Sequence, residues 1–244
     1  MFPRALLLLL FAALPLRAEI VVSASATLEG ALTEIAARWE ARGGEKVRLN
    51  LGASRSLALQ IVAGAPADLF ITANELDADE LEARALLVPA SRSVVAENTL
   101  AVIVPRRSKV ELRDPRHLAS REIRRIALAD PEAATAGIHG KRFLQKAGVW
   151  AAVQARIIPA ADVRGALAMV ATGAADAGIV FRTDALSNPA VRIAFEPDAP
   201  PILCTAALVR RRAPRPGAAA FLEFLTSPPA RDVFHAHGFG SPGR

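Results

Sequence analysis

The stretch VRLNLGASRSLALQIVAGAPADLFIT, residues 47–72, decides the fold because it predicts two strands with a helix between them. Residues 47–51 alternate apolar and polar side chains, which favours a strand. Apolar residues over 57–62 then predict a short helix that ends at Gly64, and residues 68–72 form a second apolar run. A strand, a helix and a strand in this order indicate a parallel sheet with a covering helix.

The same alternation of strands and helices continues through the chain. We expect further strands at residues 19–23, 99–104, 123–129, 157–158, 177–181, 191–195 and 202–209. We expect further helices at residues 28–39, 76–85, 138–147, 164–172, 217–226 and 229–236. This pattern predicts an α/β fold with parallel sheets covered by helices. Because no repeat or low-complexity linker interrupts the chain, two domains would have to be joined by strands that pass between them.

The first eighteen residues have the order of a secretory signal peptide. Arg4 gives a positive start, residues 5–14 are almost wholly apolar, and Ala18 supplies a small residue for cleavage. An uncleaved anchor is the alternative, although the apolar run is short for a membrane span. No cysteine follows this run, so we do not expect a lipoprotein. We expect an exported protein that is cleaved near Ala18.

Composition supports a packed core, because hydrophobic residues make up 52% of the 244 residues. The net charge is +6, and the arginines at 106–107, 124–125 and 210–212 have no interleaved aromatic residues. They therefore indicate a solvated face rather than a nucleic-acid patch. Cys204 is the single cysteine, which leaves no disulfide framework. We expect its side chain to be buried in the strand at 202–209.

Four strand-to-helix turns place small or hydroxylated residues at the start of a helix. They are SASAT (23–27), GASRS (52–56), EAATAG (132–137) and PAADVRG (159–165). The first N–H groups of a helix have no partner inside the helix, and the helix dipole adds positive potential there. Such turns suit an anion, and they lie at the sheet edge where α/β proteins bind ligands. The alternative for each turn is ordinary N-capping by Ser, Thr or Asp.

Three stretches carry a resemblance to a known family. They are GASRSLALQIVAGAPADLFITAN (52–74), LADPEAATAGIHGKRFLQKAGVW (128–150) and PAADVRGALAMVATGAADAGIVFRTDA (159–185). Together they resemble the periplasmic molybdate-binding proteins of ABC-type molybdate importers. Residues 24–40 and the segment after Pro216 fit the same family, so the resemblance covers nearly the whole chain after residue 18. The string AGAPADLFI is shared with related oxyanion binders, whereas its combination with DPE and DVRGAL is more specific.

The resemblance implies an α/β fold of two lobes around a ligand cleft, each lobe a mainly parallel sheet flanked by helices. The chain would cross between the lobes near residues 97–99 and again near 200–204. Lobe one would hold residues 19–98 with 203–244, and lobe two residues 99–202. The family further implies a periplasmic monomer that delivers molybdate to the permease and ATPase subunits of an importer. Neither catalysis nor a cofactor is expected, and molybdenum would be present only within molybdate, without direct protein ligands.

The resemblance also implies which residues contact the oxyanion. These contacts are Thr27, Ser54, Ala136, Val163 and Phe181. Thr27 and Ser54 would offer hydroxyl and backbone donors, while Ala136 and Val163 would offer only their backbone N–H groups. The family uses such neutral donors with no balancing side-chain cation.

Two of these positions depart from the family pattern. Thr27 stands where serine is common, and this keeps the hydroxyl. Phe181 stands where a tyrosine often donates a hydrogen bond, and the chain contains no tyrosine. Another hydroxyl could replace that donor, and the candidates are Ser23, Ser25 and Ser56.

Neighbouring charged residues have simpler explanations than ligand binding. We expect the side chain of Arg55 to point to solvent or to the rim of the opposite lobe. For Asp162 and Arg164 we expect a helix cap and a surface or inter-lobe ion pair.

Two alternatives remain open from the sequence. Another tetrahedral oxyanion such as sulfate would use the same kind of donors, and tungstate has nearly the size and charge of molybdate. A secreted hydrolase could pair Ser54 or Ser56 with His139, or use His235 and His237. The chain contains neither a GxSxG nor an HExxH motif, which argues against the hydrolase.

Overall fold

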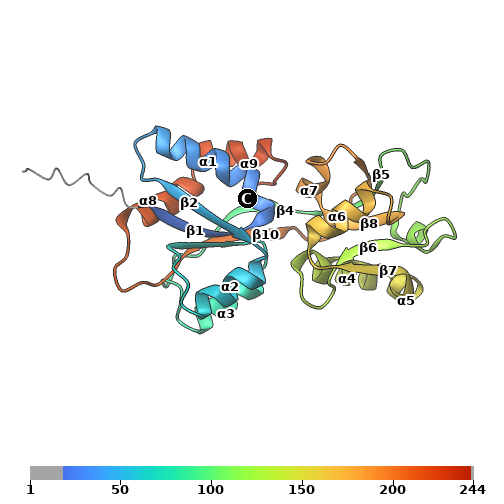
Figure 1. The fold of residues 1–244 in the computed structure, drawn as a ribbon, viewed down its shortest axis with the longest axis horizontal. Helices are drawn as coiled ribbons and strands as arrows, with labels where there is room; N and C mark the ends of the chain where they lie inside the picture. Colours follow the sequence, from blue (N-terminus) through green and yellow to red (C-terminus); the bar gives the residue numbers. More distant parts are fainter. Residues whose placement is uncertain (1–18, 243–244) are drawn as a thin grey trace, which may run out of the picture.

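The computed structural model describes residues 19–242, which form two α/β lobes lying side by side (Figure 1). Each lobe contains a five-stranded sheet, and helices cover both faces of each sheet. We call the part built on the first sheet lobe one and the part built on the second sheet lobe two. The expected signal peptide, residues 1–18, lies outside the described residues. Within residues 19–242, no helix is both long enough and apolar enough to span a bilayer.

Lobe one is built from both ends of the described chain. In the order of the sheet, its strands are β2 (Val47–Gly52), β1 (Ile20–Ser25), β3 (Leu69–Thr72), β10 (Ile202–Leu208) and β4 (Ser93–Asn98). Its helices are α1 (Glu29–Ala41), α2 (Ser54–Val62), α3 (Glu75–Ala83), α8 (Pro216–Leu225) and α9 (Pro228–Ala236). Figure 1 shows α1, α8 and α9 on one face of the sheet and α2 and α3 on the other.

Lobe two is built from the middle of the chain. In the order of the sheet, its strands are β7 (Ile157–Ala160), β6 (Ile126–Ala129), β8 (Ala177–Phe181), β5 (Leu100–Pro105) and β9 (Val191–Phe195). Its helices are α4 (Thr135–Lys146), α5 (Trp150–Val153), α6 (Val163–Ala171) and α7 (Arg182–Leu186).

Both sheets are mixed, whereas the sequence predicts mainly parallel ones. β1 is parallel to both of its neighbours and so is β6, but β10 and β5 are antiparallel to theirs. The reason is that β5 and β10 enter their lobes from the other lobe. Leu100 begins β5 opposite Phe181, which ends β8, and Thr205 of β10 pairs with Thr72, which ends β3. A strand that enters the lobe at the edge where the parallel strands end must be antiparallel to them.

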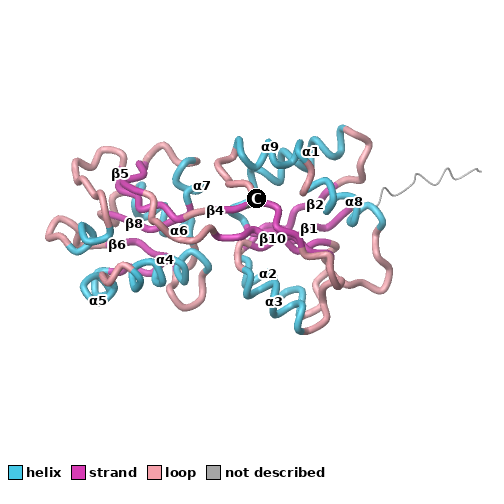
Figure 2. The backbone as a smooth tube through the Cα atoms, turned by 180° about the vertical axis from the view of Figure 1, so that it is seen from behind, coloured by secondary structure: helices cyan, strands magenta, loops and turns pink. Residues whose placement is uncertain are grey.

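The chain passes from sheet one to sheet two between β4 and β5 and returns between β9 and β10. The view from behind places β4 at the junction of the lobes (Figure 2). β4 is not among the strands that the sequence predicts, because SVVAEN carries a weak strand pattern and its pairing partner, β10, is distant in the sequence. The lobe boundaries given above stay a prediction. Ile202, for example, begins β10 of sheet one although its side chain packs in the core of lobe two.

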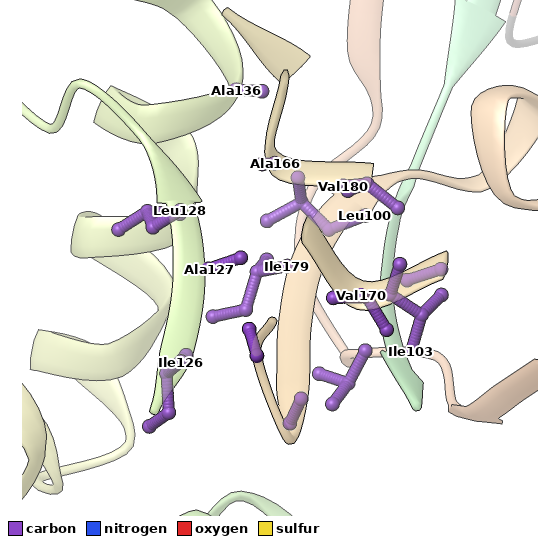
Figure 3. Close-up of a cluster of buried hydrophobic side chains, with 14 of the residues drawn as sticks. Leu100, Ile103, Ile126, Ala127, Leu128, Ala136, Ala166, Val170, Ile179 and Val180 are labelled. Carbon is purple, nitrogen blue, oxygen red and sulfur yellow. The ribbon is translucent and has the colours of Figure 1, made fainter. Parts of the chain in front are cut away.

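The core of lobe two reaches the turns that face lobe one. Leu128, Val170 and Ile179 lie in this core together with Ala136, which is in the first turn of α4 (Figure 3). Next to it, a Cβ atom on Gly137 would lie 2.1 Å from the carbonyl oxygen of Asp130. The start of α4 therefore packs directly on the chain that leaves β6. In lobe one, Cys204 is fully buried in β10, as expected.

Candidate functional site

One small cavity lies between the lobes where four strand-to-helix turns meet. It is lined by residues 25–27 and 52–55 of lobe one and by residues 133–136, 162–164 and Phe181 of lobe two. Its volume is about 70 Å³. Pockets that hold drug-sized ligands have roughly 300–1,000 Å³, so this cavity suits an ion of a few heavy atoms rather than a sugar or a peptide.

The structure brings all five sequence-predicted contacts to this cavity. Thr27, Ser54, Ala136, Val163 and Phe181 each belong to its lining. Ser54, Ala136 and Phe181 are at most 4% exposed, Val163 is 9% exposed, and Thr27 is half-buried. The side chains of Ala136 and Val163 belong to the core of lobe two. What these two residues can give a ligand is therefore their backbone N–H groups.

Two of the helix starts lack an ordinary cap. The N-cap residues of α2 and α4 are Ala53 and Ala134, whose methyl groups cannot accept a hydrogen bond. The first intrahelical bonds run from Leu57 N–H to the Ala53 oxygen at 3.1 Å and from Ile138 N–H to the Ala134 oxygen at 2.9 Å. The N–H groups before them precede the helical ladder. Ordinary N-capping by a side chain therefore does not explain these two turns.

The turns of α6 and α1 differ from each other. Asp162 caps α6, because its Oδ1 accepts the Gly165 N–H at 2.8 Å. The N–H groups of Val163 and Arg164 still precede the first helical bond, which runs from Ala166 N–H to the Asp162 oxygen at 3.2 Å. Before α1, the chain makes a 3₁₀ turn, η1 (Ala26–Leu28), and its N-cap Ser25 makes no side-chain capping bond.

Hydroxyl groups add further donors to the lining. Four residues that line the cavity have a free hydroxyl group, because no hydrogen bond within residues 19–242 uses it. They are Ser25, Thr27, Ser54 and Thr135. Of the three serines considered as a replacement for a tyrosine hydroxyl, only Ser25 lies at the cavity. Ser23 accepts a bond from Asn50 Nδ2 at 3.3 Å, and Ser56 is exposed. Thr135 was missed, although its place in the turn EAATAG was a usable signal.

Of the two expected positions for the Arg55 side chain, solvent or the rim of the opposite lobe, the structure shows the first, because the side chain is exposed and, within the described part of the chain, pairs only with residues of its own lobe. Its guanidinium donates to Glu80 and lies 3.6 Å from Asp77, both on α3 of the same lobe. The hydrogen bond from Arg55 lowers the pKa of Glu80, whereas burial raises the pKa of Asp77. Two carboxyl groups thus offset the charge of this cation beside the cavity.

Asp162 and Arg164 have the roles that the sequence predicts. Asp162 is the cap of α6, and the guanidinium of Arg164 lies 2.6 Å from Glu29 Oε2 across the two lobes. Arg164 also lines the cavity.

The histidines do not form the pairs named for a hydrolase: among the described residues, no hydrogen bond joins His139 to Ser54 or Ser56, or His235 to His237. His139 lines a different cavity, where burial lowers its pKa. His235 Nε2 lies 2.7 Å from Ser241 Oγ, and His237 Nε2 lies 3.0 Å from Glu34 Oε2. The described part of the chain also holds no group of three or more His, Cys, Asp or Glu side chains placed to bind a metal ion.

Comparison with known proteins gives consistent similarities. Residues 20–240 match the family model described as bacterial extracellular solute-binding protein. The molybdate-binding protein of Escherichia coli (strain K12) is 34% identical over 227 residues, which cover 91% of this chain and 88% of that protein. The solved periplasmic molybdate-binding protein of Azotobacter vinelandii is 27% identical, with a TM-score of 0.80 over 92% of this chain and all of that one.

A more distant structure shares the fold alone. The sulfate-binding protein SubI of Mycobacterium tuberculosis H37Rv is 19% identical, with a TM-score of 0.78 over 91% of this chain and 86% of that one. The two-lobed architecture is therefore shared by proteins that are named for molybdate and for sulfate.

Proposed function

The chain belongs to the bacterial extracellular solute-binding protein family, and we propose that it binds molybdate in the cavity between its lobes. The ligand contacts are Thr27, Ser54, Ala136, Val163 and Phe181, as the sequence predicts. Tungstate binds as well, because it has nearly the same size and charge. The protein is a carrier without catalytic activity and without a cofactor. Molybdenum is present only within the bound molybdate ion.

One observation carries this proposal: four helix starts meet at one cavity, and the N-caps of two of them are alanines. Unpaired N–H groups at a helix start attract an anion, and the helix dipoles add to the attraction. A desolvated dianion needs several donors aimed at it, and each hydrogen bond to a charged group contributes about 1.5–3 kcal/mol. The turns supply such donors from both lobes, so a bound oxyanion would hold the lobes together.

Neutral donors also explain selectivity for a fully ionised ligand. Arg55 is offset by Glu80 and Asp77, and Arg164 is paired with Glu29. A protonated phosphate would present an O–H group to a site made of donors, and that group would lack an acceptor. The site therefore favours a dianion that carries no proton.

The identity of relatives supports molybdate over sulfate. The two molybdate-binding proteins described above are 34% and 27% identical to this chain over most of its length, whereas the sulfate-binding structure is 19% identical and shows only a shared fold. We further propose a periplasmic monomer that delivers its ligand to the permease and ATPase subunits of an importer, and the likeness to molybdate-binding proteins supports this role.

Titration calorimetry with molybdate, tungstate, sulfate and phosphate tests the proposal. We expect molybdate and tungstate to bind and to raise the melting temperature, because a ligand that binds only the folded state stabilises it. At a hundredfold excess over the dissociation constant, this stabilisation is about 2.7 kcal/mol. Binding of sulfate with equal or higher affinity would contradict the molybdate assignment. Hydrolysis of ester substrates that persists through repurification would instead favour the hydrolase.

A further inference from the structure

Arg164 connects the two lobes at the edge of the cavity. From the second position of α6 in lobe two, its Nη2 atom donates to Glu29 Oε2 at 2.6 Å and to the backbone oxygen of Ala26 at 2.8 Å. Both acceptors belong to lobe one, at the start of α1 and in the turn before it. An amino group with two hydrogens can make both bonds at once.

Other hydrogen bonds between the lobes lie beside the first crossing of the chain. Asn98 Nδ2 donates to Thr183 Oγ1 at 2.8 Å, and Asn98 is the last residue of β4. Arg182 Nη1 donates to the Gly238 oxygen at 3.0 Å, and the Arg182 N–H donates to Thr99 at the crossing itself. Arg164 belongs to neither crossing, so its contact depends on how closely the helix starts of the two lobes approach.

The Ala26 oxygen that Arg164 binds belongs to the peptide group whose N–H is that of Thr27. The same oxygen also accepts the Glu29 N–H, so two donors hold it. A cationic donor on a carbonyl oxygen gives a strong, charge-assisted bond and polarises the peptide group. The Thr27 N–H at the cavity therefore becomes a better and more firmly oriented donor.

Building on the proposed function, we propose that Arg164 is a positioning residue for the oxyanion. It fixes the Ala26–Thr27 peptide when the lobes close, and it thereby couples closure to the strength of the Thr27 donor. Its positive charge acts through this peptide group, while the donors at the ligand stay neutral. The ion pair with Glu29 contributes less, because the two side chains are 53% and 48% exposed and an exposed pair is weak.

Molybdate affinity and dissociation rate, measured for the wild type and four variants, test this role. Arg164→Gln should weaken binding about five- to tenfold, mainly through faster dissociation, because it removes a charge-assisted bond that exists only in the closed arrangement. Arg164→Lys should recover part of the loss. Glu29→Gln should change the affinity by no more than about twofold, since the bond to Ala26 remains. Arg38→Gln, in an exposed pair with Glu34 on the same α1, is the matched control and should leave the affinity unchanged.

A second readout separates this role from general damage to the fold. Small-angle scattering of the ligand-free proteins should show a larger radius of gyration for Arg164→Gln than for the wild type, with equal values once both are saturated. A wild type that binds neither molybdate nor tungstate would overturn the proposed function together with this role. A wild type that binds, with Arg164→Gln matching it in affinity and dissociation rate, would overturn this role alone. Equal losses in Arg164→Gln and Glu29→Gln would also overturn it, because the ion pair would then explain the effect.

Discussion

Ala53 and Ala134 occupy helix positions at which Ser, Thr, Asp and Asn are preferred, since those side chains accept the first N–H groups of a helix. An alanine there costs stability, typically about 1 kcal/mol compared with a good cap. The cost is understandable if a ligand accepts those N–H groups in place of a side chain. The absence of a capping side chain at Ala53 and Ala134 therefore indicates which helix starts are left free for a ligand.

The first prediction concerns the hydroxyl of Ser54, which is 4% exposed at the cavity. Ser54→Ala should weaken molybdate binding by about 1.5–3 kcal/mol, because it removes a donor to a buried charged ligand. Titration calorimetry measures the change. Ser56→Ala is the matched control, since Ser56 lies in the same helix but is exposed and away from the cavity. Arg55→Ala should also cost much less, and a larger loss there would show that a cation holds the ligand.

The second prediction concerns Phe181, which is 2% exposed and ends β8 at the cavity. Phe181→Tyr adds a phenolic O–H where the family often has one, so binding of molybdate should tighten by about 1 kcal/mol. Phe234→Tyr, in the core of lobe one, is the control and should leave affinity unchanged in the fraction that folds. An affinity of Phe181→Tyr equal to the wild type would place the fifth contact at another residue, and Ser25 and Thr135 would be the next candidates.

At the scale of helices and strands, most of the turns that line the cavity were predictable, because the sequence signals for a strand end and a helix start are local. The turns at 52–56, 132–137 and 159–165 each begin a helix within a few residues of the expected start. β4 and α7 were missed, since short elements depend on partners elsewhere in the chain, as β4 depends on β10. The destination of Arg55 was also unpredictable, because its partners on α3 follow more than twenty residues later and meet it only through packing.

The third prediction is that one substitution at the start of α2 raises the stability of the fold and weakens molybdate binding. Ala53 is exposed and has an extended backbone, φ −67° and ψ 134°, which suits an N-cap residue. Ala53→Asp should raise the free energy of unfolding by about 0.5–2 kcal/mol, because its carboxylate caps the helix and complements its dipole. The same variant should lose molybdate binding, since the carboxylate occupies the N–H groups and repels a dianion. Urea unfolding and calorimetry measure the two effects.

Ala53→Asn is the matched control for this prediction, because it caps the helix without a charge. It should stabilise α2 by a similar amount and weaken molybdate binding less than Ala53→Asp does. An Ala53→Asp protein that binds molybdate as tightly as the wild type would contradict the placement of the ligand at this helix start.

At the scale of the whole molecule, the two-lobed fold followed from the resemblance of nearly the whole chain, whereas the mixed sheets did not follow from periodicity. Strand periodicity shows which residues face a core, but it carries no information on strand direction. Direction is set by the two crossings, which make β5 and β10 start at the cleft edge. The contact of Arg164 with Ala26 is likewise a property of the assembled molecule, since it joins residues 138 positions apart.

The last prediction concerns Asp184 on α7, which lies in a second cavity between the lobes, about 510 Å³ in volume. Burial raises the pKa of Asp184 to about 7; Arg164 opposes this rise and Asp162 adds to it. Its Oδ2 atom is buried without a hydrogen-bond partner among the described residues. In the unfolded chain the carboxyl ionises near its ordinary pKa of 3.8. Between pH 3.8 and about 7, the carboxyl group is therefore protonated in the folded state and ionised in the unfolded state. The free energy of unfolding falls as pH rises through this range, because the folded state binds more protons.

Asp184→Asn removes this ionisation, so the variant should gain stability relative to the wild type at pH 8, on the order of a few kcal/mol. At pH 4.5 the gain should be much smaller, because the wild-type carboxyl is then protonated when folded and only partly ionised when unfolded. Urea unfolding at the two pH values measures the difference, with Asp232→Asn on the exposed face of α9 as the control. An equal gain at both pH values would contradict the prediction, since a change of packing alone does not depend on pH. Because the cavity is shared by α1 and α7, ionised Asp184 also favours any opening of the lobes that brings water to it.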